Sequence, residues 1–80
     1  MSEDELVKIL QDGFPGDKVT VGGDGHHFET RIISDKFEGL KLLDRHKLVY
    51  SFVDDRLKNG SLHALNIHAV TTSEWQNING

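Results

Sequence analysis

The residues best suited to chemistry in this 80-residue chain are histidines. His63 stands near the start of the segment 61–70, and His26 and His27 follow a glycine-rich stretch. A neutral imidazole suits zinc, copper and iron, and its availability falls as the pH drops through about 6.5. Two histidines leave a metal ion with an incomplete coordination sphere, and the chain has no cysteine to complete it. Further ligands would have to come from another molecule, and the alternative is a polar turn without a metal role.

The element that must position His63 is the segment 61–70. Leu65, Ile67 and Ala69 alternate with polar residues, and this period of two predicts a half-buried strand. The same alternation predicts that His63 lies on the face of the apolar series. Because His63 lies where the strand emerges from the Asn59-Gly60 turn, we expect it to be reachable from outside while the strand holds it.

His26 and His27 belong to a predicted hairpin. Residues 18–21 and 27–34 read as two strands, joined by the turn Gly22-Gly23-Asp24-Gly25. Strict alternation places His26 on the face of Phe28, and His27 on the opposite face. The glycine-rich turn also matches the GxxG string of KH nucleic-acid-binding domains, but Asp24 and the hairpin setting favour an ordinary turn.

Three helices and a short turn complete the predicted elements. Ser2 and Glu5 form a capping box for a helix at about 3–11, and Thr71 and Glu74 form a second one before a brief final helix that lets Trp75 pack against the body. A turn carrying Phe37 precedes a longer helix at about 40–58, which Asn59-Gly60 ends. The apolar stripe predicted for this helix comprises Leu42, Val49, Phe52, Val53 and Leu57.

The order of these elements is α-β-β-α-α-β-α. A helical crossover between the second and third strands makes those strands parallel if they share a sheet. If they are also neighbours, they begin at the same end of that sheet. The topology therefore predicts that His26, His27 and His63 come together, although they are distant in sequence.

Composition restricts the function classes. The net charge is −4, which argues against a general attraction to nucleic acids, and the only local concentration of positive charge is Lys41, Arg45 and Lys47 with His46. A solvated helix face with intrahelical pairs is the simpler interpretation of that patch, and a hydrogen-bonded, half-buried residue is the simpler one for His46. No nucleophile and base are spaced for catalysis, so we expect no enzyme.

No apolar run approaches the roughly 20 residues that cross a bilayer, and the first residues are acidic. We therefore expect one domain over residues 1–80, without a membrane partner, in the cytoplasm, with an organelle matrix as the alternative compartment.

Four motifs in order resemble the BolA family, whose pattern reads FxG, RHRxV, HAL and TPxEW. They cover nearly the whole chain and are Phe37-Glu38-Gly39-Leu40, Arg45-His46-Lys47-Leu48-Val49-Tyr50, His63-Ala64-Leu65 and Thr71 through Trp75. The His27-Phe28 pair after a hairpin turn is also similar to the family. The resemblance implies an α+β fold of the class II KH type, with a three-stranded mixed sheet covered by helices.

The resemblance also implies a function. Members of the family are non-enzymatic partners of monothiol glutaredoxins, which implies a heterodimer here and a monomer when the chain is alone. The histidine of the HAL motif, His63, would be the principal ligand to a bridging [2Fe-2S] cluster, with His27 as the second ligand and His26 as its alternative. Glutaredoxin and glutathione would supply thiolates, and the isolated protein would hold no cofactor. The expected role is iron–sulfur trafficking or iron regulation, and the alternative is a KH-like DNA-binding transcriptional regulator that uses Lys41, Arg45 and Lys47.

One departure from the family pattern concerns the last motif. Thr72 replaces its proline, which weakens the pre-organisation of the final helix but leaves the Thr71 cap intact.

Overall fold

The structure is a computed structural model that describes residues 1–23 and 27–79. The elements are, in chain order, α1 (Glu3–Gly13), β1 (Lys18–Gly23), β2 (His27–Ile33), a 3-10 turn η1 (Asp35–Phe37), α2 (Leu42–Lys58), β3 (Ala64–Val70) and α3 (Thr72–Asn79). This is the predicted α+β order. Within the described residues, no helix is both long enough and apolar enough to span a bilayer.

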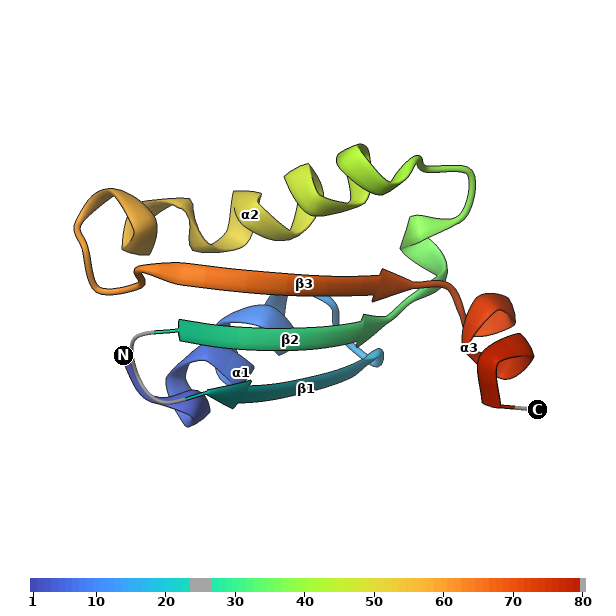
Figure 1. Cartoon of the computed structure of the whole chain (residues 1–80), viewed down its shortest axis with the longest axis horizontal. Coiled ribbons are helices and arrows are strands. Elements are labelled where there is room, and N and C mark those ends of the chain that lie inside the picture. Colours follow the sequence, from blue (N-terminus) through green and yellow to red (C-terminus); the bar gives the residue numbers. More distant parts are fainter. Residues whose placement is uncertain (24–26, 80) are drawn as a thin grey trace.

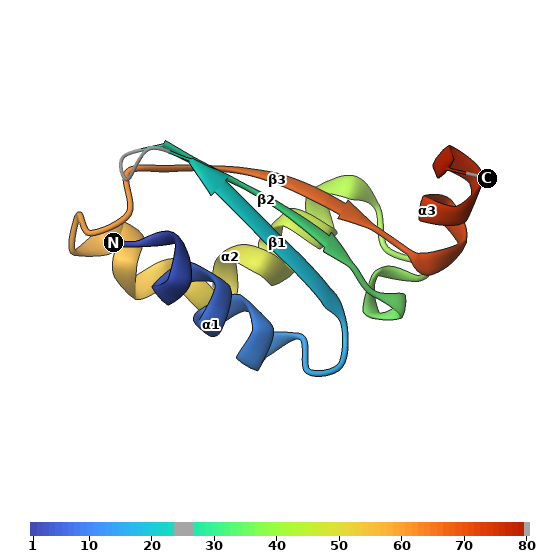
Figure 2. The same ribbon diagram turned by 90° about the horizontal axis from the view of Figure 1, so that it is seen from below.

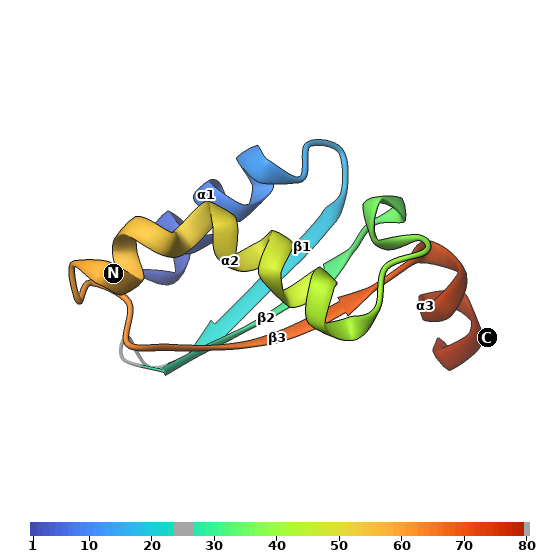
Figure 3. The same ribbon diagram turned by 90° about the horizontal axis from the view of Figure 1, so that it is seen from above.

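The sheet has the order β1-β2-β3, with β1 antiparallel to β2 and β2 parallel to β3. Its mixed topology is the one that the helical crossover predicts. Helices α1 and α2 lie together on one face of the sheet, whereas α3 lies beyond the end of β3 (Figure 1, Figure 2). The helices therefore cover one face of the sheet, and the other face is open (Figure 3).

The core lies between the sheet and the two covering helices. Phe14 is fully buried at the C-cap of α1, and its ring centroid lies 5.4 Å from those of both Phe37 and Phe52. Burying a side chain of this size contributes about 1.5–3 kcal/mol. The other buried apolar residues of this core are Leu6, Leu10, Phe28, Ile32, Val49, Val53, Leu62, Leu65, Ile67 and Ala69.

The apolar stripe of α2 is shorter than the sequence predicts. The helix begins at Leu42, two residues later than expected, and Val49 and Val53 are buried on it. Leu42 is 63% exposed, so its place in the stripe was wrong. Helical periodicity puts Leu42 on the same side as Val49, but the first turn of α2 has no covering element over that position. The helix ends as predicted, with Gly60 in the left-handed region at φ +81°.

Candidate functional site

The register of β2 and β3 brings the predicted histidines to one end of the sheet. His27 pairs with Ala64 across the parallel ladder, so the backbone of His63 lies one residue before the partner of His27. Both side chains are exposed. The starts of the two strands lie side by side at the same end in the ribbon views (Figure 1, Figure 3).

His63 lies one residue before the strand, so it does not continue the alternation of the apolar series as the sequence predicts. The strand begins only at Ala64, and Leu62 is the buried residue before it, 1% exposed. The Leu62 N–H donates to the carbonyl of Arg56 at 3.1 Å, so the chain is still leaving the α2 turn and has not entered the period of a strand. His63, between the buried Leu62 and the start of the strand, is exposed.

The loop before His63 is fixed from both sides. The Asn59 side-chain oxygen accepts hydrogen bonds from the N–H and the hydroxyl of Ser61. Gly60 supplies the left-handed turn, and Leu62 is anchored in the core. His63 is therefore an exposed side chain on a short, well-bonded loop.

The register places His27 on the open face of the sheet. Phe28 pairs with Leu65, so the core faces of β2 and β3 coincide, and His27 belongs to the opposite, open face. His63 lies outside the strand, so alternation does not set its direction, and a strand end allows both imidazoles to be approached from beyond the sheet. His26, the alternative ligand, lies outside the described residues.

The side chains at this end of the sheet include two possible nitrogen ligands and no complete metal site. Among the described residues, no group of three or more histidine, cysteine or carboxylate side chains could hold a metal ion. The chain has no thiol. His27 and His63 could provide nitrogen ligands to one iron, and thiolates for a second iron would have to come from a partner.

Arg45, a member of the predicted basic patch, has a structural role at the opposite end of the sheet. Its guanidinium makes two bonds to the Glu74 carboxylate, at 2.6 and 3.1 Å, and also donates to the carbonyls of Ala69 and Leu40 at 3.1 and 2.9 Å. The side chain is only 13% exposed. Arg45 thereby ties α2 to the end of β3 and to α3.

These contacts shift two ionisation equilibria. The hydrogen bond to Glu74 raises the pKa of Arg45. The same bond, together with the Thr71 N–H at 2.8 Å, lowers the pKa of Glu74 to about 2. Thr71 in turn accepts from the Glu74 N–H at 3.1 Å, which completes the predicted capping box even though Thr72 replaces the proline.

The remaining patch consists of two exposed lysines, Lys41 and Lys47, with exposed Asp44 between them. His46 is half-buried as expected, but its Nε2 is buried and has no hydrogen-bond partner in the part of the chain that the structure describes. The sequence interpretation of His46 as hydrogen-bonded was therefore wrong at this atom. The contact between Arg45 and Glu74 joins residues 29 positions apart, so helical spacing could not reveal it.

Sequence reasoning also missed Tyr50. Its hydroxyl donates to the Leu65 carbonyl at 3.1 Å, while Arg45 donates to the Ala69 carbonyl on the same strand. Two side chains of α2 thus occupy backbone acceptors of β3, which is an edge strand of the sheet in the described residues. The RHKLVY stretch therefore contributes to closing a sheet edge.

Comparisons with known proteins agree with this geometry. The family profile described as BolA-like protein matches residues 7–74. The chain is 38% identical over 89 aligned positions to the DNA-binding transcriptional regulator BolA of Vibrio cholerae, covering 99% of this chain and 83% of that protein.

Solved structures show the same fold. A BolA homologue from Coxiella burnetii superposes with a TM-score of 0.83 at 30% identity, covering 95% of this chain and 97% of the other. The BolA domain of SufE1 from Arabidopsis thaliana gives 0.78 at 33% identity, covering 90% and 93% of the two chains. The chain therefore belongs to the BolA family.

Proposed function

We propose that the protein is an adaptor that binds a monothiol glutaredoxin and co-ligates a bridging [2Fe-2S] cluster. His63 is the principal ligand from this chain, and His27 is the second. The observation that carries the proposal is the position of two exposed imidazoles from separate elements at one end of the sheet, in a chain without thiols.

The chemistry of the donors explains why a partner is needed. Each iron of such a cluster takes two ligands from its surroundings, so two imidazoles would fill the positions on one iron and leave those on the other to a partner. The glutaredoxin cysteine and glutathione would complete the set with thiolates. Imidazole in place of thiolate on one iron raises the reduction potential, which suits iron sensing or the transfer of a cluster to another protein.

The test is reconstitution of the mixed complex. The protein and a monothiol glutaredoxin are mixed with iron, sulfide and glutathione, and visible absorption and circular dichroism spectra are recorded. We expect a coloured heterodimer whose spectrum differs from that of the glutaredoxin homodimer. His63→Ala should abolish the difference, and His27→Ala should alter the spectrum of the heterodimer.

The matched control is His68→Ala, because His68 is also exposed and lies on β3, five residues from His63. It should leave the spectrum unchanged. A heterodimer spectrum that survives His63→Ala would remove His63 from the ligand set, whereas equal losses in His63→Ala and His68→Ala would indicate a general effect of histidine removal.

A second function, DNA binding, is favoured by one observation. The relative from Vibrio cholerae is named a DNA-binding transcriptional regulator. Lys41 and Lys47 are exposed and could contact phosphates. Arg45 is less suited to do so, because its guanidinium is already bonded to Glu74. The net charge of −4 opposes general binding to DNA.

Salt dependence tests this second function. If the two lysines contact phosphates, neutralising both as Lys41→Gln and Lys47→Gln should make the plot of log affinity against log salt shallower by about two. The control is Lys8→Gln with Lys58→Gln, which changes the net charge equally at exposed sites elsewhere. Equal slopes for the two double variants would exclude the patch as a DNA contact.

A further inference from the structure

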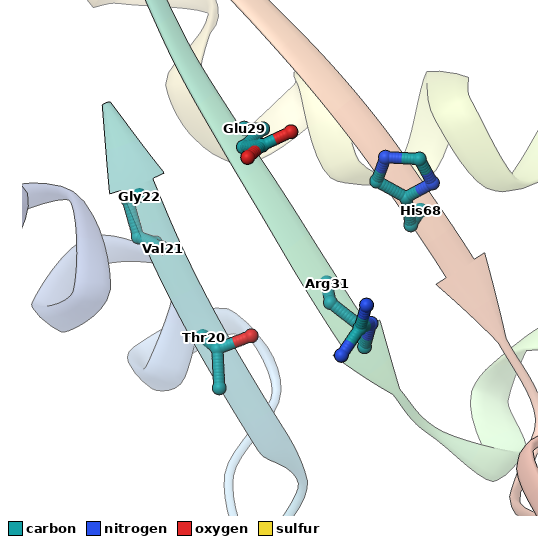
Figure 4. Close-up of a pocket in the computed structure, with 6 residues that line it drawn as sticks. All are labelled: Thr20, Val21, Gly22, Glu29, Arg31 and His68. Atoms are coloured by element: carbon teal, nitrogen blue, oxygen red, sulfur yellow. The ribbon is translucent and has the colours of Figure 1, made fainter. Parts of the chain in front are cut away.

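The open face of the sheet carries side chains in cross-strand rows. Thr20, Arg31 and His68 form one row, because Arg31 pairs with Thr20 across the antiparallel ladder and with His68 across the parallel one. Gly22 and Glu29 belong to the next row. Figure 4 shows Thr20, Glu29, Arg31 and His68 projecting from the three strands over the same area.

This area is hollowed. A cavity of about 220 Å³ is lined by Thr20, Val21, Gly22, Glu29, Arg31 and His68, and a second of about 200 Å³ by Lys18, Thr20, Arg31, Ile33 and Trp75. The two share Thr20 and Arg31, so they lie next to each other on the open face, and we call them together the trough. Gly22 has no side chain, and a Cβ there would meet only the Glu29 side chain, at 4.0 Å. The missing side chain leaves the space beside Glu29 open.

The Arg31 side chain contacts Trp75 in this trough, and its guanidinium N–H groups can still bind a ligand. Its guanidinium carbon lies 4.7 Å from the centroid of the Trp75 ring, which is a cation–π contact. The ion pairs of the described residues, Arg45 with Glu74 and Lys58 with Asp54, do not include Arg31, and its side chain makes no hydrogen bond within that part of the chain. A guanidinium whose N–H groups make no hydrogen bond within the described residues is suited to a carboxylate or phosphate.

The negative charge of Glu29 restricts which class of ligand could bind beside Arg31. It is exposed, lies two residues from Arg31 on the same strand face, and forms no ion pair with it among the described residues. Because Glu29 and Arg31 are two residues apart on one strand, their Cα atoms lie about 6.6–6.8 Å apart. A phosphate dianion beside Arg31 would be repelled by the Glu29 carboxylate, whereas a ligand with neighbouring opposite charges would satisfy both groups.

We propose that the trough binds a small α-amino carboxylate. Its carboxylate lies on the Arg31 guanidinium, with Lys18 and the Thr20 hydroxyl nearby, and its ammonium group lies on Glu29 over Gly22. The site is on the open sheet face and is separate from the sheet end that carries His63. It does not depend on the proposed cluster.

The probe is glycine, the smallest α-amino carboxylate, compared with acetate, methylammonium and inorganic phosphate at equal ionic strength. Trp75 is the only tryptophan, so its fluorescence reports on Arg31, and amide NMR shifts of Thr20, Gly22 and Arg31 locate the ligand. We expect a saturating change with glycine and an affinity about tenfold or more above those of the other three probes, because each of them lacks one of the two charge-assisted contacts.

Two variants test the charged contacts. Arg31→Gln should weaken glycine binding about tenfold or more, and Glu29→Gln should reduce the affinity for glycine to that for acetate. Arg56→Gln, on α2 behind the opposite face of the sheet, is the matched control and should change nothing.

A third variant blocks the space. Gly22→Val places a β-branched side chain in the trough where the backbone has room for a Cβ, so the fold should be retained and glycine binding lost. The proposal is overturned if glycine gives no saturating change. It is also overturned if acetate or phosphate binds as tightly as glycine, which would indicate a simple anion site, or if Gly22→Val folds and still binds.

Discussion

The two ends of the sheet are built in opposite ways. At the end where β2 and β3 finish, Arg45, Glu74 and Thr71 form a continuous set of hydrogen bonds. At the end where these strands begin, His27 and His63 are exposed. The first end fixes the positions of α2, β3 and α3, so the second can present imidazoles without a large effect on stability.

We call the end where β2 and β3 finish the bonded end. Its hydrogen bonds also include those of Ser34, which follows β2. Its N–H donates to the Val70 carbonyl at 2.9 Å, and its hydroxyl donates to the Asp17 carboxylate at 2.7 Å. Ser34 is fully buried and also caps η1 by accepting from the Lys36 N–H. Polar groups at this end therefore serve mainly to join elements.

The largest loss of stability should come from replacing Arg45, which is at the centre of the hydrogen bonds at the bonded end. Arg45→Ala removes the side-chain donor to the Ala69 carbonyl and leaves the Glu74 carboxylate with the Thr71 N–H but without its guanidinium partner. The variant should lower the free energy of unfolding by about 2–3 kcal/mol. His63→Ala should change it by less than about 0.5 kcal/mol, because the side chain is exposed. Urea unfolding of both variants measures the difference, and equal losses would contradict the contrast between the two ends.

A smaller loss of stability is expected from a substitution in the turn before His63. Gly60 lies at φ +81°, so Gly60→Ala should cost about 1–2 kcal/mol of unfolding free energy. Gly16→Ala is a matched control, since Gly16 lies at φ +80° and a Cβ at either glycine meets no atom within 4 Å. Both should lose similar stability, but only Gly60→Ala should move the imidazole proton NMR signals of His63. Unchanged signals would show that this turn does not position the imidazole.

Thr71→Ala should remove the cap of α3 at a cost of about 1 kcal/mol. Thr72→Ala changes the neighbouring exposed residue and should be nearly neutral. Thermal unfolding compares the two, and a neutral Thr71→Ala would mean that Arg45 alone holds α3.

The smallest expected effect is a change in the pH dependence of stability when Glu74 is replaced. The pKa of Glu74 is lowered to about 2 in the folded protein, whereas an unfolded glutamate titrates near its ordinary value. Between these values the unfolded state binds more protons, so this stabilisation is fully present above the unfolded pKa and is lost as the pH falls toward 2. Glu74→Gln should flatten the fall in stability over this acidic range, and an unchanged slope in acid denaturation would contradict the role of the pair.

The fold could be predicted largely from local patterns. Alternation in 61–70, the helical stretch between the second and third strands, and the two capping boxes each depend on residues close in sequence. The parallel pairing of β2 and β3 followed from the crossover rule, and it correctly brought His27 and His63 to one end.

What could not be predicted depends on contacts between distant residues. Arg45 resembled a surface cation because its partners Glu74 and Ala69 come from later elements. Leu42 matched the helical period, but whether a stripe position is buried depends on what covers it. His63 matched the strand period, but the buried Leu62 before it broke the alternation.

The most direct test of the proposed cluster site is pulsed electron paramagnetic resonance of the reduced complex with glutaredoxin, using this protein labelled with ¹⁵N-histidine. Hyperfine coupling from labelled nitrogen should be observed, should be lost or reduced in His63→Ala, and should persist in His68→Ala. A reduced cluster bound in the heterodimer without coupling to any labelled nitrogen would contradict ligation by this chain.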